Sequence, residues 1–234
     1  QQKGIEEFRI TSIAEGSVPG SPWALDDAFS SAWTPSIAVF PDGDVYALWG
    51  FLAGFQGAFE IQGGVVSENR LLEDVEIISP KGGTSTDPPR LAYDRSGNLG
   101  LAYMNRVDFQ SRIQFQHRPY KGQWTEPIFI DSGETDATQP DVVFGMDNNA
   151  YVIYQEDIGG IYQIGLAVVS LLDNAVISRQ VLSTPDVNAR TPTLAVDSGK
   201  GRLHAAWVEK SFDGEWTIKY RRQQLTQVRN WGSY

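Results

Sequence analysis

Aromatic side chains occur at four regularly spaced places in the chain, and at three of them an acidic side chain accompanies the aromatic one. They are Phe51 with Phe55, Asp108 with Phe109, Asp157 with Tyr162, and Phe212 with Asp213. Aromatic faces beside carboxylates and amides suit sugar rings, which stack through C–H groups and hydrogen-bond through hydroxyls. The pattern therefore predicts a carbohydrate-binding surface. The alternative interpretation is that the aromatic rings pack between structural elements and the acids cap turns.

Other chemistry has weaker support in the sequence. The two histidines, His117 and His204, are far apart in strand-like patterns, and there is no cysteine. A histidine or thiolate metal site is therefore not expected. Asp-Asn-Asn and Asp-Ser-Gly turns supply oxygen atoms of the kind that calcium binds. Because such turns are usually just turns, we predict no cofactor and keep calcium as an alternative.

These residues lie within a sequence unit that occurs four times: a proline, a short apolar run, an Asp/Gly/Asn turn, and a second run ending in Trp or Tyr. The units begin at Pro35, Pro89, Pro140 and Pro192, at intervals of 54, 51 and 52 residues. A repeat of about 50 residues built from short strands is typical of a β-propeller with one blade per repeat. We therefore predict a single all-β domain, a four-bladed β-propeller of antiparallel four-stranded blades.

The predicted blades span residues 35–79, 89–131, 140–183 and 192–234. In the second blade, Trp124–Ile130 is the expected fourth strand, and its Pro127 is tolerable only at a sheet edge. The aromatic residues that end the second strands occupy the same position in every repeat, which predicts packing between blades. These residues are Trp49, Tyr103, Tyr154 and Trp207.

The fourth repeat lacks a fourth strand, and the N-terminal segment 5–13 has no blade of its own. This segment resembles the fourth strands of the other repeats, so we predict that it pairs with the last blade and closes the ring. Closure would also remove exposed sheet edges. Two alternatives are a chain cut from a larger propeller and a subunit that donates its first strand to a neighbour.

Variable segments on a repeated scaffold are where binding residues usually lie. The segment 14–34 is the longest connection and contains Trp23 and Trp33, which either plug the central channel or form a ligand platform. Charged residues follow the inner aromatic positions less regularly and predict either a polar ring near the channel or salt bridges between blades. They are Arg106, Glu156, Asp157, Glu209 and Lys210.

Composition limits the possible partners. The 234 residues carry a net charge of −10, which repels phosphate backbones and anionic lipid surfaces, so nucleic acid is an unsuitable partner. No apolar run is long enough for a transmembrane helix. The absence of cysteine and the start at Gln1 fit a secreted or cell-surface protein, which is the expected location.

The repeat pattern P-x-L-A-x-D-x-x-G-N-L-x-x-A-[WY] resembles that of sialidase-like (BNR-type) propellers. In the fourth repeat, Arg190-Thr-Pro192 and the acids Glu209 and Asp213 look like the opening blade of sialidases. The resemblance implies that Arg190 is a carboxylate clamp, Asp213 an acid/base and Glu209 a supporting acid. However, the other clamp arginines, the Tyr–Glu nucleophile pair and the family's Asp-box have no match here.

The sequence therefore predicts a non-catalytic binding module, most plausibly for carbohydrate, with a glycan or protein ligand. The predicted ligand-binding residues are Trp23, Trp33, Phe55, Arg106, Phe109, Asp157, Tyr162, Arg190 and Phe212. One alternative is a structural or assembly subunit, a homo-oligomer in which the N-terminal strand engages a neighbour. The other is a glycosidase or a fragment of one, with Asp213 and Glu209 as catalytic candidates.

Overall fold

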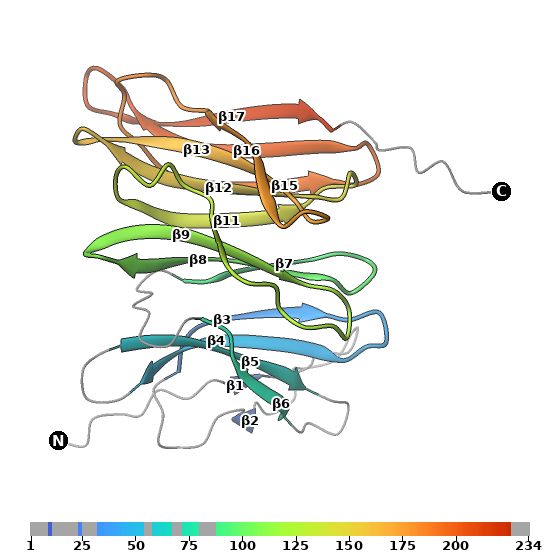
Figure 1. The fold of residues 1–234 in the computed structure, drawn as a ribbon. Helices are drawn as coiled ribbons and strands as arrows, with labels where there is room; N and C mark the ends of the chain where they lie inside the picture. The colour runs from blue at the N-terminus through green and yellow to red at the C-terminus, as the bar shows by residue number, and fades with distance from the viewer. Residues whose placement is uncertain are drawn as a thin grey trace. The chain divides into compact units, whose positions relative to one another are not determined.

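The computed structural model describes residues 9–10, 23–24, 32–53, 58–66, 72–79 and 88–225. Every regular element in these ranges is a β-strand, as predicted (Figure 1). Within the same ranges, no helix has the length and hydropathy needed to cross a bilayer. The chain divides into two compact units, residues 1–89 and 90–234, and each is described by itself.

The first unit contains one four-stranded antiparallel sheet in the order β3-β4-β5-β6. Its strands are β3 (Ala32–Val39), β4 (Val45–Ala53), β5 (Ala58–Val66) and β6 (Leu72–Ile77). A separate two-stranded sheet pairs β1 (Arg9–Ile10) with β2 (Trp23–Ala24).

The second unit contains three antiparallel sheets that follow one another in chain order (Figure 1). The first has β7 (Arg90–Tyr93), β8 (Leu99–Val107), β9 (Gln110–Arg118) and β10 (Ile128–Phe129). The second has β11 (Ala137–Phe144), β12 (Asn149–Ile158), β13 (Ile161–Ser170) and β14 (Ala175–Val181). The third has β15 (Ala189–Asp197), β16 (Arg202–Lys210) and β17 (Trp216–Gln224).

Two-residue turns join the second and third strands in the first two of these sheets. The β12–β13 turn places Gly159 and Gly160 at φ 64° and 87°, and the β8–β9 turn places Asp108 and Phe109 at φ 50° and 67°. Two successive positive φ values are typical of the type I′ turn, whose twist matches that of the flanking strands. The sequence therefore keeps the second and third strands in strict register up to the turn.

The inner aromatic series is buried, and two of its members, Tyr154 and Trp207, lie in the clusters that join neighbouring sheets, as predicted for the series. Trp49, Tyr103, Tyr154 and Trp207 are all buried, with at most 5% of each side chain exposed. In β8 and β12 they lie in continuous runs of buried residues, because these strands are covered on both faces. In β16, buried and partly exposed residues alternate. The outer strand β14, in contrast, is mostly exposed.

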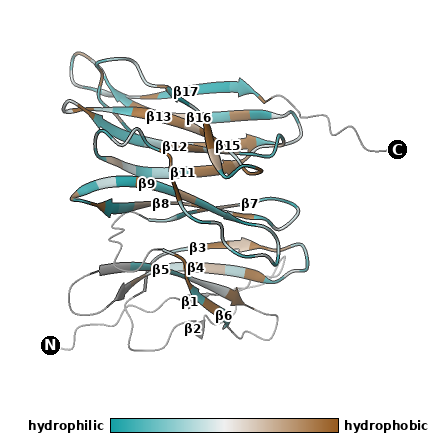
Figure 2. Cartoon of the chain, in the orientation of Figure 1, coloured by the Kyte–Doolittle hydropathy of each residue, from teal (hydrophilic) through white to brown (hydrophobic). Residues whose placement is uncertain are grey.

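Two apolar clusters hold the sheets of the second unit together. One joins the β7–β10 sheet to the β11–β14 sheet and includes Phe115 and Phe144; the other joins the latter to β15–β17 and includes Leu166 and Leu203. Hydrophobic segments lie within these strands, whereas β17 is mostly hydrophilic (Figure 2). Among the described residues of this unit, neighbouring sheets in the chain thus share apolar clusters, as neighbouring repeats do.

The fourth strand of the second repeat is shorter than predicted. The expected strand Trp124–Ile130 contains a β-strand only at Ile128–Phe129. Pro127 has no N–H to donate and ends the ladder. Upstream, Thr125 still holds the edge of β9, because its N–H donates to the His117 carbonyl (2.8 Å) and its hydroxyl accepts the His117 N–H (3.0 Å).

The structure shows another pairing for the predicted closing segment 5–13, whose pairing with the last blade stays a prediction. The two residues of this segment that the structure describes, Arg9 and Ile10, pair with Ala24 and Trp23. The sheet of β15–β17 has three strands within the described part of the chain. Pairing with a segment nearby in sequence costs less loop-closure entropy than pairing across the whole chain.

Candidate functional site

One asparagine fixes the arrangement of the second and third sheets of the second unit at their turn end. The Asn188 side-chain carbonyl accepts the N–H of Tyr162 (3.0 Å), and its backbone carbonyl accepts the N–H of Lys210 (2.8 Å). The same two bonds recur one repeat earlier, where they join Asp136 to Ser111 (2.6 Å) and to Asp157 (2.8 Å). An Asp or Asn at this position therefore joins the start of the first strand to two other strands. Its side chain binds the third strand of the preceding sheet, and its backbone binds the second strand of its own sheet.

A β-bulge follows immediately and determines the direction of Arg190. The pairing of β15 with β16 shifts register between Arg190 and Thr193, and Thr191 has φ 51°. The same bulge occurs in β3 and β11, where Thr34 and Gln139 precede Pro35 and Pro140 at φ 48° and 53°. Bulges redirect the neighbouring side chain, and here that side chain is an arginine only in the last sheet.

The Arg190 guanidinium lies between two aromatic rings. Its central carbon is 5.1 Å from the centroid of the Tyr162 ring and 5.4 Å from that of Trp216. Tyr162 is half-buried, whereas Arg190 and Trp216 are exposed, Trp216 by 45%. We call these three residues the Arg190 cluster. Both distances are within the range of a cation–π contact, which holds a long and flexible side chain in one place.

Glu209 is a buried structural acceptor. Its carboxylate accepts hydrogen bonds from Trp207 Nε1 (2.8 Å), from the Thr184 N–H (2.8 Å) and from the Thr184 hydroxyl (2.9 Å). Lys219 Nζ lies 3.9 Å away. Burial raises the pKa of Glu209, but these hydrogen bonds and the Lys219 charge lower the pKa further than burial raises it. The carboxylate is therefore ionised and saturated with donors.

Asp213 lies in the exposed β16–β17 turn. Its carboxylate accepts a hydrogen bond from the Ser211 hydroxyl, which lowers the pKa of Asp213 below its ordinary value. The neighbouring Phe212 side chain is fully exposed. Asp213 thus acts as a turn cap, the alternative that the sequence also allowed.

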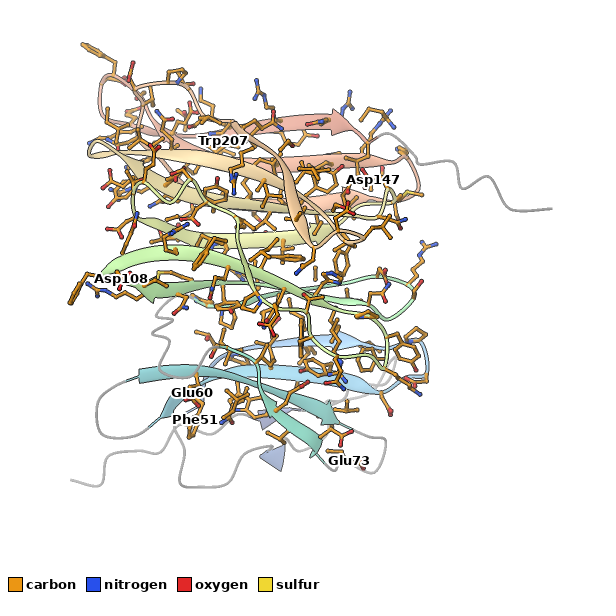
Figure 3. All side chains as sticks on the ribbon, in the orientation of Figure 1. Phe51, Glu60, Glu73, Asp108, Asp147 and Trp207 are labelled. Carbon is orange, nitrogen blue, oxygen red and sulfur yellow. The ribbon has the colours of Figure 1, made fainter. Side chains whose placement is uncertain are left out.

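The remaining sequence candidates are distributed along the chain. Phe109 is 90% exposed and Arg106 is exposed, both at the β8–β9 turn, where Asp108 projects from the sheet (Figure 3). Asp157 faces Tyr162 across the β12–β13 hairpin and caps the turn by accepting the Gly160 N–H at 2.7 Å.

Three candidates, Trp23, Trp33 and Phe55, lie wholly or by their side chains outside the described residues. Trp23 lies in β2 and Trp33 in β3, but their side chains lie outside the described residues, as does Phe55 altogether. Their assignment to a ligand platform stays a prediction.

The sequence analysis did not predict two residues of the site, Trp216 and Asn188. Trp216 begins a strand, and in the sequence an aromatic residue in a strand indicates packing. Its contact with Arg190 depends on the register of the β16–β17 hairpin, which places Trp216 opposite Lys210. Asn188 belongs to a turn-rich stretch with no distinguishing motif. The repeat alignment contains a signal for Asn188, because Asp136 and Asn188 occupy the same position relative to Pro140 and Pro192.

The turns considered for calcium use their acids internally. Asp197 of an Asp-Ser-Gly turn accepts the Lys200 N–H (3.1 Å), and Asp147 of the Asp-Asn-Asn turn accepts the Tyr151 hydroxyl (2.6 Å). Among the described residues, no group of three or more His, Cys, Asp or Glu side chains is arranged to hold a metal ion. That the protein binds no cofactor, with calcium as the alternative, stays a prediction from the sequence.

No protein-family profile matches the chain, and no curated protein sequence matches it. Solved structures do. The NanB sialidase from Streptococcus pneumoniae aligns with 92% of this chain and 35% of its own, at 10% identity and a TM-score of 0.54. A neuraminidase-like protein from A/bat/Guatemala/164/2009 aligns with 92% of this chain and 60% of its own, at 11% identity and a TM-score of 0.54.

A neuraminidase-like protein of A/flat-faced bat/Peru/033/2010 aligns with 97% of this chain and 73% of its own, at 12% identity and a TM-score of 0.51. The chain thus spans less than two thirds of the first two of these structures. At such low identity the likeness is one of fold. Together with the four repeated antiparallel sheets, it shows that this chain has a sialidase-like β-propeller fold.

Proposed function

We propose that the protein is a glycan-binding propeller module and that the Arg190 cluster is its binding surface. The observation that carries the proposal is the exposed guanidinium between the rings of Tyr162 and Trp216. The exposed Trp216 and the half-buried Tyr162 offer apolar surface for sugar C–H groups, and Arg190 offers hydrogen-bond donors beside them. The same arrangement has no counterpart at the equivalent position of the preceding sheet, where Thr138 replaces Arg190.

The guanidinium suits an acidic group on such a glycan. A guanidinium can donate two parallel hydrogen bonds to a carboxylate, and the Arg190 side chain is exposed. Because both aromatic contacts hold the side chain in place, less rotamer entropy is lost when a ligand binds. The cluster is therefore well prepared for a sugar that carries a carboxylate.

The two acids favour binding over hydrolysis. A general acid must be protonated near the working pH, which requires a pKa raised towards neutrality. The pKa values of Glu209 and Asp213 are instead both lowered. Glu209 is also already occupied by donors from Trp207 and Thr184. An extracellular location fits a glycan ligand but stays a prediction from the sequence.

The test is a glycan array followed by calorimetry on the best ligand. We expect Tyr162→Ala, Trp216→Ala and Arg190→Ala each to lower the affinity by about fivefold or more, because one aromatic contact contributes about 1 kcal/mol. Trp216→Phe, which keeps an apolar face, should retain more binding than Trp216→Ala.

The matched control is Tyr93→Ala, which removes another exposed aromatic ring from a strand of the same unit. It should bind as the unchanged protein does. An array without any ligand, or equal binding by the cluster variants and the control, would refute the proposal. Circular dichroism of each variant separates a loss of binding from a loss of folding.

A further inference from the structure

A second cation lies beside the Arg190 cluster. Arg190 faces Val208 across the β15–β16 ladder, and Lys210 follows Val208 by two residues on β16. Residues two apart in a strand point to the same face of the sheet. Lys210 also faces Trp216 across the β16–β17 ladder. Arg190, Lys210 and Trp216 therefore share one face of the β15–β17 sheet.

Lys210 is close enough to Arg190 to contact the same ligand. The two residues are diagonal neighbours on one face, and such positions lie about 7–8 Å apart, within reach of long side chains. The Lys210 Cε lies 3.9 Å from the position that a β-carbon on Gly214 would occupy. The lysine side chain therefore runs along the β16–β17 turn, which leads directly into Trp216.

Neither cation is neutralised by a carboxylate. The side chains of Arg190 and Lys210 are exposed, and within the described part of the chain neither forms an ion pair. Two like charges held at neighbouring positions repel each other, and anionic groups bound beside them would relieve the repulsion. The pair therefore favours a ligand with more negative charge than a single carboxylate supplies.

The acids that are nearest to the cluster along the chain are directed elsewhere. Glu209 precedes Lys210 but is buried on the opposite face of the sheet. Asp213 and Asp157 each accept a hydrogen bond from within their own turn. Glu215 is exposed. The anion that would balance Lys210 is therefore expected to come from a ligand.

The sheet that carries the cluster differs in charge from the preceding sheet. Residues 189–224, which include β15–β17, contain seven Lys or Arg and four Asp or Glu. Residues 137–181, which include β11–β14, contain one Arg and five Asp or Glu. The last sheet is thus locally positive in a chain whose net charge is −10. A local field of this sign attracts anionic ligands over about one Debye length, whatever the net charge of the chain.

We propose that the ligand of the Arg190 cluster is a glycan with two anionic groups, the first bound by Arg190 and the second by Lys210. This inference rests on the proposed glycan-binding function and specifies its ligand class. Trp216 contacts Arg190 and faces Lys210, so its ring offers apolar surface to the sugar between the two anionic groups. The second group is a carboxylate or a sulfate ester, because a lysine ammonium binds either one as a point charge.

The test compares three trisaccharide probes by calorimetry at low salt. The probes share one backbone and carry one uronic acid, two uronic acids, or one uronic acid and one sulfate ester. The unchanged protein should bind at least one two-anion probe about threefold or more tightly than the one-anion probe, as one exposed ion pair allows. Lys210→Gln should bring this affinity ratio close to one, whereas Lys210→Arg, which keeps the charge, should retain it. The tighter of the two-anion probes identifies the second group.

The matched control is Lys200→Gln, which removes an exposed lysine from the β15–β16 turn at the other end of the same sheet. It changes the net charge equally and should leave the affinity ratio unaltered. Equal affinity for all three probes, with binding still lost in Arg190→Ala, would overturn this inference and leave the proposed function standing. A ratio that Lys210→Gln leaves unaltered, or that the control lowers as much, would also overturn it. If no probe bound at all, both the proposed function and this inference would fall.

Discussion

Glu209 illustrates how a residue that resembles a catalytic acid can be part of the scaffold. It stands two residues after the inner aromatic Trp207 and accepts hydrogen bonds from the segment that leaves the preceding sheet. Glu156 has the same place after Tyr154 and accepts the Ser132 N–H at 3.1 Å. The repetition of this contact one blade earlier indicates a structural role, since a catalytic site would need it only once.

Replacing Glu209 should destabilise the protein. Glu209→Ala leaves the Trp207 and Thr184 donors without an acceptor in a buried place, which we expect to cost about 2–4 kcal/mol. Denaturant titration at neutral pH measures this loss. Glu215→Ala, which changes an exposed glutamate of the nearby turn, is the control and should alter the free energy of unfolding by less than about 0.5 kcal/mol. Equal effects of the two substitutions would contradict the structural role.

The stabilisation from Glu209 should also depend on pH. Because the folded state lowers the pKa of this carboxyl, the stabilisation is present above the ordinary glutamate range and is lost as the pH falls through the folded-state pKa. Between about pH 5 and pH 3, the unchanged protein should therefore lose more unfolding free energy than Glu209→Gln. Parallel pH profiles of the two proteins would argue against this assignment.

At the scale of the elements, the repeated bulge before Pro35, Pro140 and Pro192 is the feature that gives each first strand its shape. A threonine at φ 51°, such as Thr191, is strained because its branched side chain crowds the backbone in the left-handed region. The structure retains this strain in three sheets. We infer that the bulge is a structural part of the repeat. The identity of the residue before it, such as Arg190, differs between the sheets and can serve function.

Thr191→Gly should stabilise the protein. Relief of left-handed strain gains about 1–2 kcal/mol, while glycine costs up to about 1 kcal/mol of backbone entropy, so we expect a net gain of about 0.5–1 kcal/mol in unfolding free energy. The Thr191 N–H that donates to Gln139 is kept (3.2 Å). Thr193→Gly is the control with the opposite sign, because it loses the hydroxyl bond to Asp141 (2.8 Å). A thermal melt showing loss of stability in both variants would refute the strain.

At the scale of the whole molecule, the second unit is a series of sheets that contact mainly their chain neighbours. The Phe115 cluster joins its first and second sheets, and the Leu203 cluster joins its second and third. Stability in such a series is a sum of repeat and interface contributions rather than the property of one central core. Damage to one interface should therefore remain partly local.

Hydrogen exchange can test this locality. Leu203→Ala, at a side chain only 2% exposed, should cost about 2–5 kcal/mol and reduce protection mostly in β15–β17. Phe115→Ala, at a fully buried side chain, should instead reduce protection mostly in β7–β10. If either substitution lowered protection equally in all three sheets, the unit would be a single cooperative body.

The repeat, the all-β class and the burial of the inner aromatic series could be predicted from the sequence, because they depend on local turn chemistry and on apolar runs that recur in register. Tyr162 and Arg190 were also among the predicted site residues. Trp216, Asn188, the structural role of Glu209 and the pairing of Arg9–Ile10 with Trp23–Ala24 were not predicted. They depend on which side chains distant strands bring within contact distance, and sequence spacing does not encode that distance.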